Sequence, residues 1–354
     1  MKHTHSPLTS TVSRLVPSRL LTASLALGAV LPASAANLIV NGDFSGGTGG
    51  TLDPGSPTAT NNQVPTGWTG FATGQGAIKV QSNMVNFNGE NRPTGSYIEQ
   101  DVTTSANRWY VLDWQQASHT GGDSSGVAVT STLTSGASST TNRYRGMASP
   151  QSLILAGGTT TTVRLSDDGA TTGSLDTRID NVSFDLANGQ YNMAGLAIIN
   201  ASSTHAAFGT DPYNAVDGRT GGESNTNYHS QSAGGMFELD FTANFANALI
   251  DRIEIEARSG FNNRKGDLIE IYSTSGSLIE SISITGADDL AASYGIDGYW
   301  RNVGRIVVTE NGQTLNVSEV RAFSSFIDGV AVPEPGSSSL LALGGVALLL
   351  RRRK

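Results

Sequence analysis

Acidic pairs and histidines are the side chains of this sequence that could take part in catalysis. Two acidic pairs are adjacent in the chain, Asp167-Asp168 and Asp288-Asp289. Glycoside hydrolysis needs two carboxylates at a fixed distance with separate pKa values, whereas neighbouring residues of a strand point to opposite sides. No His-Glu-x-x-His metal-binding pattern is present. The sequence therefore predicts a protein that is not an enzyme.

Aromatic side chains are the groups that could contact a sugar, because the apolar face of a sugar ring packs on an aromatic face. The first half of the chain offers five candidates: Trp68, Trp109, Tyr110, Trp114 and Tyr144. The segment Trp109–Trp114 has the alternation of a strand, so we expect at least one of its two tryptophans in the core.

The composition narrows the class of protein and of partner. The 354 residues include 42 glycines, only 15% charged residues and a net charge of -8. Nucleic acid is excluded as a partner, because its phosphates require a clustered Lys/Arg surface and the body of the chain has no basic cluster. Cysteine is absent, so metal ions or core packing must stabilise the domains.

Residues 1–36 have the organisation of a signal peptide. A basic stretch precedes an apolar run over residues 20–31, and Ala33-Ser34-Ala35 supplies small residues for a peptidase. A buried helix is the alternative, but it would need a polar face, and the apolar run offers only two hydroxyl side chains. The sequence predicts export, with a mature chain that begins near Ala36.

Residues 327–354 form a tail with three ordered parts. The motif Val332, Pro333, Glu334, Pro335 comes first, an apolar run within residues 337–350 follows, and four cations end the chain. The apolar run is shorter than the roughly 20 residues that cross a bilayer comfortably, and the cations are expected on the cytoplasmic side. A short transmembrane helix at 337–350 is predicted.

These three parts resemble the PEP-CTERM sorting signal of Gram-negative, matrix-producing bacteria. The resemblance covers only about the last two dozen residues. It implies that a membrane exosortase processes the tail near the Val332 to Pro335 motif and releases or re-anchors the protein, which is membrane-associated before processing. A simple C-terminal membrane anchor is the alternative.

Between the two ends, short runs rich in Val, Ile, Thr and Tyr alternate with Gly, Asn and Ser, and no long helical periodicity occurs. This pattern is typical of β-sandwiches and barrels. We therefore expect an all-β protein with two tandem jelly-roll sandwiches, over residues 37–190 and 191–326.

Four short motifs mark the first domain: Asn41-Gly-Asp-Phe44, Gly67-Trp68, Tyr97-Ile-Glu-Gln100 and Asp176–Phe184. With them the domain resembles the galactose-binding-like jelly rolls of bacterial carbohydrate-binding modules. The resemblance implies that Asp43 and Asp180, near the first and last strands, share a calcium ion. Two exposed turn carboxylates are the alternative.

A longer series of motifs marks the second domain: Tyr213–Arg219, Tyr228-His-Ser, Met236–Asp240, Ile253–Arg258, Asn263–Gly266, Leu268–Tyr272 and Leu315–Val320. In this order they resemble the discoidin-type domains, which are the coagulation factor C-terminal type modules, and among them the fucose-binding lectins. The resemblance runs over nearly the whole domain and implies a galactose-binding-like jelly roll.

The lectin resemblance implies a calcium loop. Asn214 and Arg219 would supply carbonyl oxygens, Asp217 a carboxylate, and Glu319 an oxygen from the last strand. A tight Asn-x-x-Asp-Gly turn directs several oxygens to one point, which suits a cation that takes about six to eight oxygen ligands. An Asx turn closed by Gly218 is the alternative.

The same resemblance implies a sugar site made of a histidine and two cations. His229, Arg258 and Lys265 follow the order of the lectin residues, and Arg264 is a rival for the last position. A planar guanidinium and an imidazole can together bind adjacent hydroxyls. The lectins have an aspartate at the position of Gly260, and their paired cysteines and tryptophan pair are missing here, so fucose specificity does not follow. Solvated surface cations are the alternative.

The sequence thus predicts an exported surface or matrix protein that binds a polysaccharide or glycan without catalysis, with calcium as a structural cofactor. A surface or biofilm-matrix structural protein without a specific ligand is the alternative. The run Thr159–Thr162 does not predict ice binding, because ice binding requires a repeated array of threonines and the sequence shows no fixed-period repeat.

Overall fold

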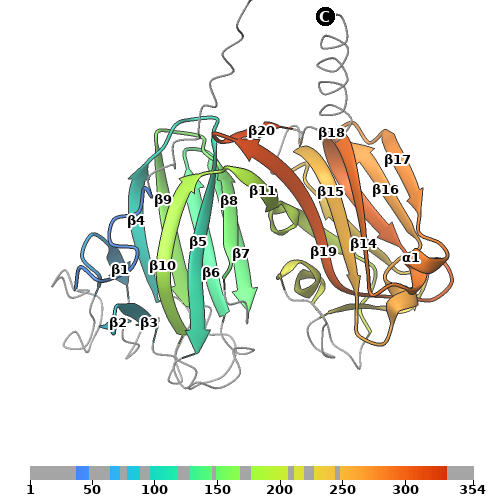
Figure 1. Cartoon of the computed structure of the whole chain (residues 1–354), viewed down its shortest axis with the longest axis horizontal. Coiled ribbons are helices and arrows are strands. Elements are labelled where there is room, and N and C mark those ends of the chain that lie inside the picture. Colours follow the sequence, from blue (N-terminus) through green and yellow to red (C-terminus); the bar gives the residue numbers. More distant parts are fainter. Residues whose placement is uncertain are drawn as a thin grey trace, which may run out of the picture. The chain divides into compact units, whose positions relative to one another are not determined.

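The computed structural model describes residues 37–47, 64–71, 78–87, 96–118, 128–145, 149–167, 177–205, 211–218, 227–243 and 248–332. The predicted signal peptide, the apolar run of the tail and Pro333 to Pro335 lie outside these residues. Within them the fold is all-β, as the sequence predicted, and its strands form antiparallel sheets (Figure 1). In this described part of the chain, no helix is long and apolar enough to span a membrane.

The first ten strands form a sandwich of two five-stranded sheets, called the first sandwich below. One sheet has the order β1 (Thr69–Phe71), β4 (Tyr97–Thr103), β9 (Thr160–Asp167), β6 (Ala128–Ser135) and β7 (Ser138–Arg145). The other has the order β2 (Ile78–Gln81), β3 (Met84–Phe87), β10 (Thr177–Leu186), β5 (Trp109–Ser118) and β8 (Gln151–Leu155). This arrangement confirms the predicted jelly-roll class.

The core of the first sandwich is built from alternate residues of its strands. On β4, Ile98 and Val102 are buried, whereas the residues between them point to the other face. The N-terminal segment closes the sandwich alongside β10, because the amide of Leu38 donates to Phe184 O (3.0 Å) and the amide of Val182 donates to Gly42 O (2.9 Å).

The remaining strands form a second sandwich, in which the long strand β18 (Ser293–Thr309) takes part in both layers. Its second part pairs with β14 (Met236–Asp240) and β16 (Leu268–Ser273), and this layer is completed by β12 (Ile198–Ala201) and β17 (Leu278–Ser283). Its first part pairs with β15 (Ala248–Ala257), which pairs in turn with β19 (Thr314–Ile327). Three short strands flank β19: β11 (Gly189–Asn192), β13 (Tyr228–Ala233) and β20 (Val330–Val332).

The change of layer along β18 occurs at residues 302–304. Asn302 has a φ of 56°, a left-handed conformation that asparagine tolerates. Gly304 follows, and a Cβ there would lie 2.7 Å from the Cα of Thr274. The strand therefore bends here, close to the backbone of Thr274, and continues in the other layer.

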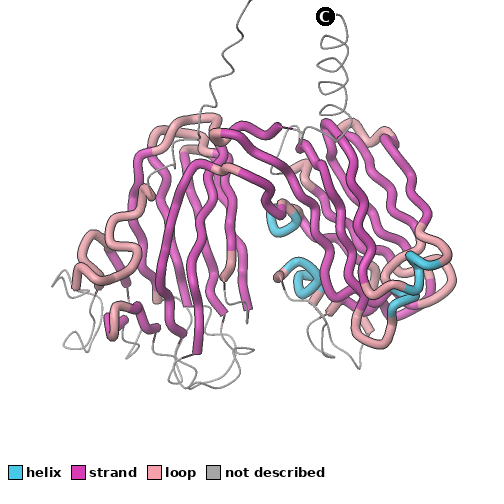
Figure 2. Tube along the Cα trace, viewed as in Figure 1, coloured by secondary structure: helices cyan, strands magenta, loops and turns pink. Residues whose placement is uncertain are grey.

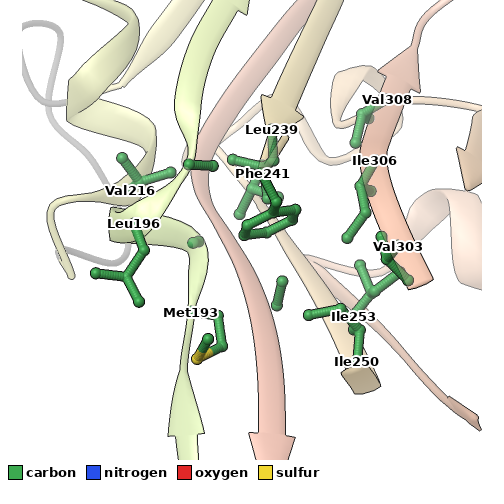
Figure 3. Packing of buried hydrophobic residues seen from close by; sticks show 14 of the residues in the cluster. Met193, Leu196, Val216, Leu239, Phe241, Ile250, Ile253, Val303, Ile306 and Val308 are labelled. Carbon is green, nitrogen blue, oxygen red and sulfur yellow. The ribbon is translucent and has the colours of Figure 1, made fainter. Parts of the chain in front are cut away.

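Apolar side chains from both layers of the second sandwich meet in one core. Figure 3 shows four of them in the same space: Leu239 of β14, Phe241 just after β14, Ile253 of β15 and Ile306 of β18. Each of these four side chains is fully buried. Burial of such side chains contributes about 1.5–3 kcal/mol each, which explains how a chain without cysteine remains folded.

Helices in the described residues are short and lie in the connections (Figure 2). They are η3 (Ala194–Leu196), η4 (Pro212–Val216), η5 (Asn262–Arg264) and α1 (Ala287–Leu290). The second and third of these carry predicted site residues. The predicted domain boundary between residues 190 and 191 lies inside β11, and it stays a prediction.

Candidate functional site

The predicted histidine and arginine of the sugar site lie on either side of one residue of β19. His229 on β13 pairs with Asn316, and the backbone amide of Arg258, just after β15, donates to Asn316 O (3.3 Å). Val317 pairs with Tyr228 on one edge and with Ala257 on the other. Residues separated by about 30 positions in the sequence are thus brought together at the start of β19.

Two arginines pack against one aromatic ring in the loop that follows β15. The guanidinium carbons of Arg258 and Arg264 lie 4.9 Å and 5.2 Å from the ring centroid of Phe261. Arg264 also donates from Nε to Gln313 Oε1 (2.9 Å) and from Nη1 to Thr314 Oγ1 (3.2 Å). Cation–π contact and neutral hydrogen-bond acceptors allow two cations to remain close together.

His229 is held as a neutral imidazole beside these arginines. Its side chain is 6% exposed and stacks on His205, with ring centroids 4.9 Å apart. Burial, and then the charges of His205, Arg258 and Arg264, lower the pKa of His229 to about 4. A neutral imidazole has one nitrogen that can accept a hydrogen bond at ordinary pH.

The structure does not fit a ligand-binding role for Lys265. Its side chain is fully buried, and Nζ donates to the carbonyl oxygens of Asn262 (3.1 Å) and Asp289 (2.6 Å). Burial lowers the pKa of Lys265, and the neighbouring acidic residues oppose this effect. The rival, Arg264, occupies the position next to Arg258 and His229. The sequence order could not separate the two, because they are adjacent in the chain.

Two buried carboxylates meet at the predicted calcium loop. Asp217 follows η4 and is 7% exposed, and Glu319 on β19 is fully buried. The amide of Gly218 donates to both oxygens of Glu319 (3.3 and 3.2 Å). Burial, and then the charge of Asp217, raise the pKa of Glu319 well above its usual range.

The other two predicted calcium ligands of this loop are Asn214 and Arg219. Asn214 is half-buried within η4, and Arg219 lies outside the described residues. Among the residues that the structure describes, no group of three or more histidine, cysteine or acidic side chains is arranged to hold a metal ion. A cation bound here would need carbonyl oxygens besides the two carboxylates.

The other predicted calcium pair, Asp43 and Asp180, takes part in local turns. Both oxygens of Asp43 accept from Ser45 Oγ (3.0 and 2.9 Å), and Asp180 Oδ1 accepts from the amide of Asn181 (2.7 Å). The pairing of residues 38–42 with β10 brings the first and last segments of the sandwich together. The shared calcium ion stays a prediction.

Four of the five candidate aromatic residues of the first sandwich are buried core residues: Trp68, Tyr110, Trp114 and Tyr144. Trp114 packs edge-on against Tyr144 at 5.0 Å, and the ring of Tyr110 stacks on Phe184 at 5.2 Å. Trp109 is partly buried against the apolar cluster that includes Phe326 of β19. The four buried side chains stabilise the fold.

Sequence reasoning missed several residues around the arginines and the histidine: His205, Phe261, Gln313, Thr314 and Asn316. Phe261 lies between Arg258 and Arg264 in the sequence, and this spacing is a local signal that could have identified it. The other four lie far from the arginines in the chain. The pairing of β13, β15 and β19 brings three of them together, and the amide of His205 donates to His229 O (2.9 Å).

Comparison with known proteins identifies the C-terminal tail. Residues 331–354 match the model of the PEP-CTERM protein-sorting motif. The chain therefore carries this sorting signal, as the sequence resemblance implied, and the signal implies export and sorting by an exosortase. No match was found among curated proteins.

Solved structures similar to part of the chain include carbohydrate-binding proteins. A fucose-binding module of Streptococcus pneumoniae is 18% identical, with 37% of this chain and 96% of that chain covered and a TM-score of 0.33. A fucolectin from striped bass (Morone saxatilis) serum is 14% identical, with 70% and 86% covered and a TM-score of 0.31. A family 32 carbohydrate-binding module from Clostridium perfringens, in complex with galactose, is 14% identical, with 38% and 98% covered and a TM-score of 0.30.

Proposed function

We propose that this protein is an exported, exosortase-sorted surface protein that binds glycans without catalysis, through a site formed by His229, Arg258 and Arg264. The observation that carries the proposal is the convergence of two guanidinium groups on Phe261 beside a buried, neutral imidazole. The sorting tail supports delivery to the cell surface, where polysaccharides are available. Association with the membrane before processing of the tail is part of the proposal.

The chemistry of the site favours a ligand rich in hydroxyl groups or carrying carboxylates. A guanidinium has five N–H donors in a planar fork, and the contacts with Gln313 and Thr314 engage two of those of Arg264. Adjacent hydroxyls of a sugar match the remaining donors and the imidazole acceptor. The carboxylate of a hexuronic acid would in addition pair with one of the two cations.

Calcium belongs to the same proposal as a structural ion. Two carboxylates that are buried side by side repel each other, so one must bind a proton or both must share a cation. Asp217 and Glu319 form such a pair, and the carbonyl oxygens of Asn214 and Arg219 would complete the ligands. The ion would connect the η4 loop to β19, the strand that also carries Asn316.

A glycan array with the mature protein, in calcium and in chelator, tests the glycan site. Arg258→Ala should remove binding at a cost of about 1.5–3 kcal/mol, the usual value of hydrogen bonds to charged groups. Arg258→Lys should restore little, because the planar fork is lost. Arg301→Ala is the matched control, since Arg301 also lies over an aromatic ring, that of Tyr299, at 4.5 Å.

Retention of the same glycans by the parent and by Arg258→Ala would contradict the proposed site. Retention of no glycan by the parent, in calcium or in chelator, would favour a structural surface protein without a specific ligand.

A further inference from the structure

The outward face of the sheet β1-β4-β9-β6-β7 in the first sandwich is polar across all five strands. Inward positions are buried, among them Ile98, Leu133 and Val163. The alternate positions are exposed or half-exposed. Most of them carry hydroxyl groups: Thr69, Thr103, Thr130, Thr132, Thr134, Ser139, Thr141, Thr160, Thr162 and Ser166.

Strand register places these hydroxyls in rows across the sheet. Thr103 is opposite Thr160, and Thr162 is opposite Thr134, which is opposite Ser139. In the next row Thr132 is opposite Thr141, and their hydroxyl oxygens are 3.4 Å apart. The array joins strands that are far apart in the sequence, so the single run Thr159–Thr162 did not reveal it.

An aromatic pair lies at the β1–β4 side of this face. The rings of Phe71 and Tyr97 stack with centroids 6.0 Å apart, and the guanidinium carbon of Arg164 lies 4.0 Å from the centroid of Tyr97. Arg164 donates from Nε (2.8 Å) and Nη2 (2.6 Å) to Glu99 Oε2. The ring of Tyr97 and the guanidinium of Arg164 are thus held in place on the outer face. Core packing does not require an aromatic ring there.

The charged side chains that the structure describes on this face balance one another. Glu99 pairs with Arg164, and Asp101 accepts from Thr162 Oγ1 (2.6 Å). Arg143, on β7, is the second cation among these described side chains. Two acidic and two basic groups give this described part of the face no net charge to attract a polyanion.

We propose that this face is a second binding surface, for a neutral, extended polysaccharide. Aromatic rings beside fixed hydrogen-bonding groups match a sugar ring with its apolar face and its hydroxyl edge. Neighbouring strands lie about 4.8 Å apart, so the row Thr162, Thr134 and Ser139 across three strands, with further hydroxyls beside it, can contact successive sugars of one chain. The inference does not depend on the site around Arg258.

Affinity electrophoresis of the mature Arg258→Ala protein tests the surface without a contribution from the other site. Native gels would contain soluble β-glucan, xylan or galactomannan, with alginate as an acidic polysaccharide. At least one neutral polysaccharide should retard the protein. Tyr97→Ser should reduce the affinity at least about fivefold, in line with the loss of about 1 kcal/mol or more for an aromatic contact.

The control is Tyr299→Ser, which removes a tyrosine of the second sandwich whose ring also lies under an arginine, Arg301 on β18. Thr132→Val and Thr134→Val, which keep the side-chain shape, provide a second test if Tyr97→Ser does not fold. These two should also weaken retardation, whereas Tyr299→Ser should leave it unchanged.

Three outcomes of the electrophoresis would overturn the proposal: no retardation by any neutral polysaccharide, retardation by alginate alone, or equal retardation of the Tyr97→Ser, Thr132→Val and Tyr299→Ser proteins. Inhibition of ice recrystallisation without polysaccharide binding would identify the hydroxyl array as an ice-binding face instead, and would likewise overturn it.

Discussion

At the scale of single residues, burial shifts the pKa of two predicted site residues, His229 and Glu319. His229 and Glu319 are both buried, and burial disfavours the charged form of either group. The imidazole therefore loses its proton more readily and the carboxyl group keeps its proton more firmly. The two residues consequently respond to pH in opposite directions, and each response can be measured.

Glycan binding should be insensitive to pH until His229 begins to bind a proton. Because its pKa is lowered to about 4, we expect constant affinity from pH 8 to pH 5 and weaker binding as the pH approaches 4. The unfolded chain binds this proton near pH 6.5, so the free energy of unfolding should fall as pH decreases from 6.5 toward 4. Urea denaturation of the parent and of His229→Gln checks this. An equal acid dependence in both proteins would contradict the assignment.

Glu319 should make stability fall with rising pH when calcium is absent. The folded protein keeps the carboxyl proton above the ordinary pKa of 4.5, whereas the unfolded chain releases it. Stability is therefore lost as pH rises from 4.5 through the raised pKa. Calcium should restore it and raise the melting temperature at pH 7, because an ion that binds only the folded state stabilises it.

Asp217→Ala and Glu319→Gln should remove the stabilisation by calcium. Asp240→Asn is a suitable control, because Asp240 is an acidic turn residue that accepts from Thr242. Equal melting temperatures of the parent protein in calcium and in chelator would exclude the metal site.

At the scale of elements, the loop from Arg258 to Gly266 positions the arginines. Lys265 joins the loop to α1 through the carbonyl of Asp289, and Asn262 Nδ2 donates to Leu290 O (3.2 Å). Gly266 has a φ of +114°, and a Cβ there would collide with Val308 of β18. The loop is thus fixed at two places: at its contacts with α1, and at Gly266, shortly before β16 begins.

Lys265→Met should lower stability by about 1–3 kcal/mol, because the carbonyl groups of two half-buried residues lose their donor. Glycan binding should weaken as well, since the loop carries Arg258 and Arg264. If Lys265 contacted the ligand directly, its substitution would instead reduce binding without loss of stability. Chemical denaturation and glycan affinity of the same variant separate these cases, with Lys79→Met of β2 as the control.

At the scale of the whole molecule, two cysteine-free sandwiches are combined with a sorting tail. Each sandwich buries its own apolar core, and their proposed glycan surfaces use different chemistry, arginines with a histidine in one and hydroxyl rows with an aromatic pair in the other. Two weak sites on one chain would strengthen attachment to a polymer that can reach both.

Replacement of Pro333-Glu334-Pro335 by alanines should leave export intact and retain a larger, membrane-bound form, because the motif would no longer be processed. Cell fractionation with mass measurement of the protein checks this in the native host. If the variant and the parent appear in the same cell fractions with equal masses, another part of the tail directs sorting.

The sequence by itself determined the all-β class, the sorting tail and the order of His229, Arg258 and Arg264, because alternation and linear motifs are local properties of a chain. It left open whether Arg264 or Lys265 lies beside Arg258 and His229, and which aromatic rings are buried. Only the tertiary structure decided these points. A side chain's direction depends on the register between strands that are distant in sequence, and a shift of one residue exchanges the buried and exposed faces. The same register collects the scattered threonines of β4, β6, β7 and β9 into one surface.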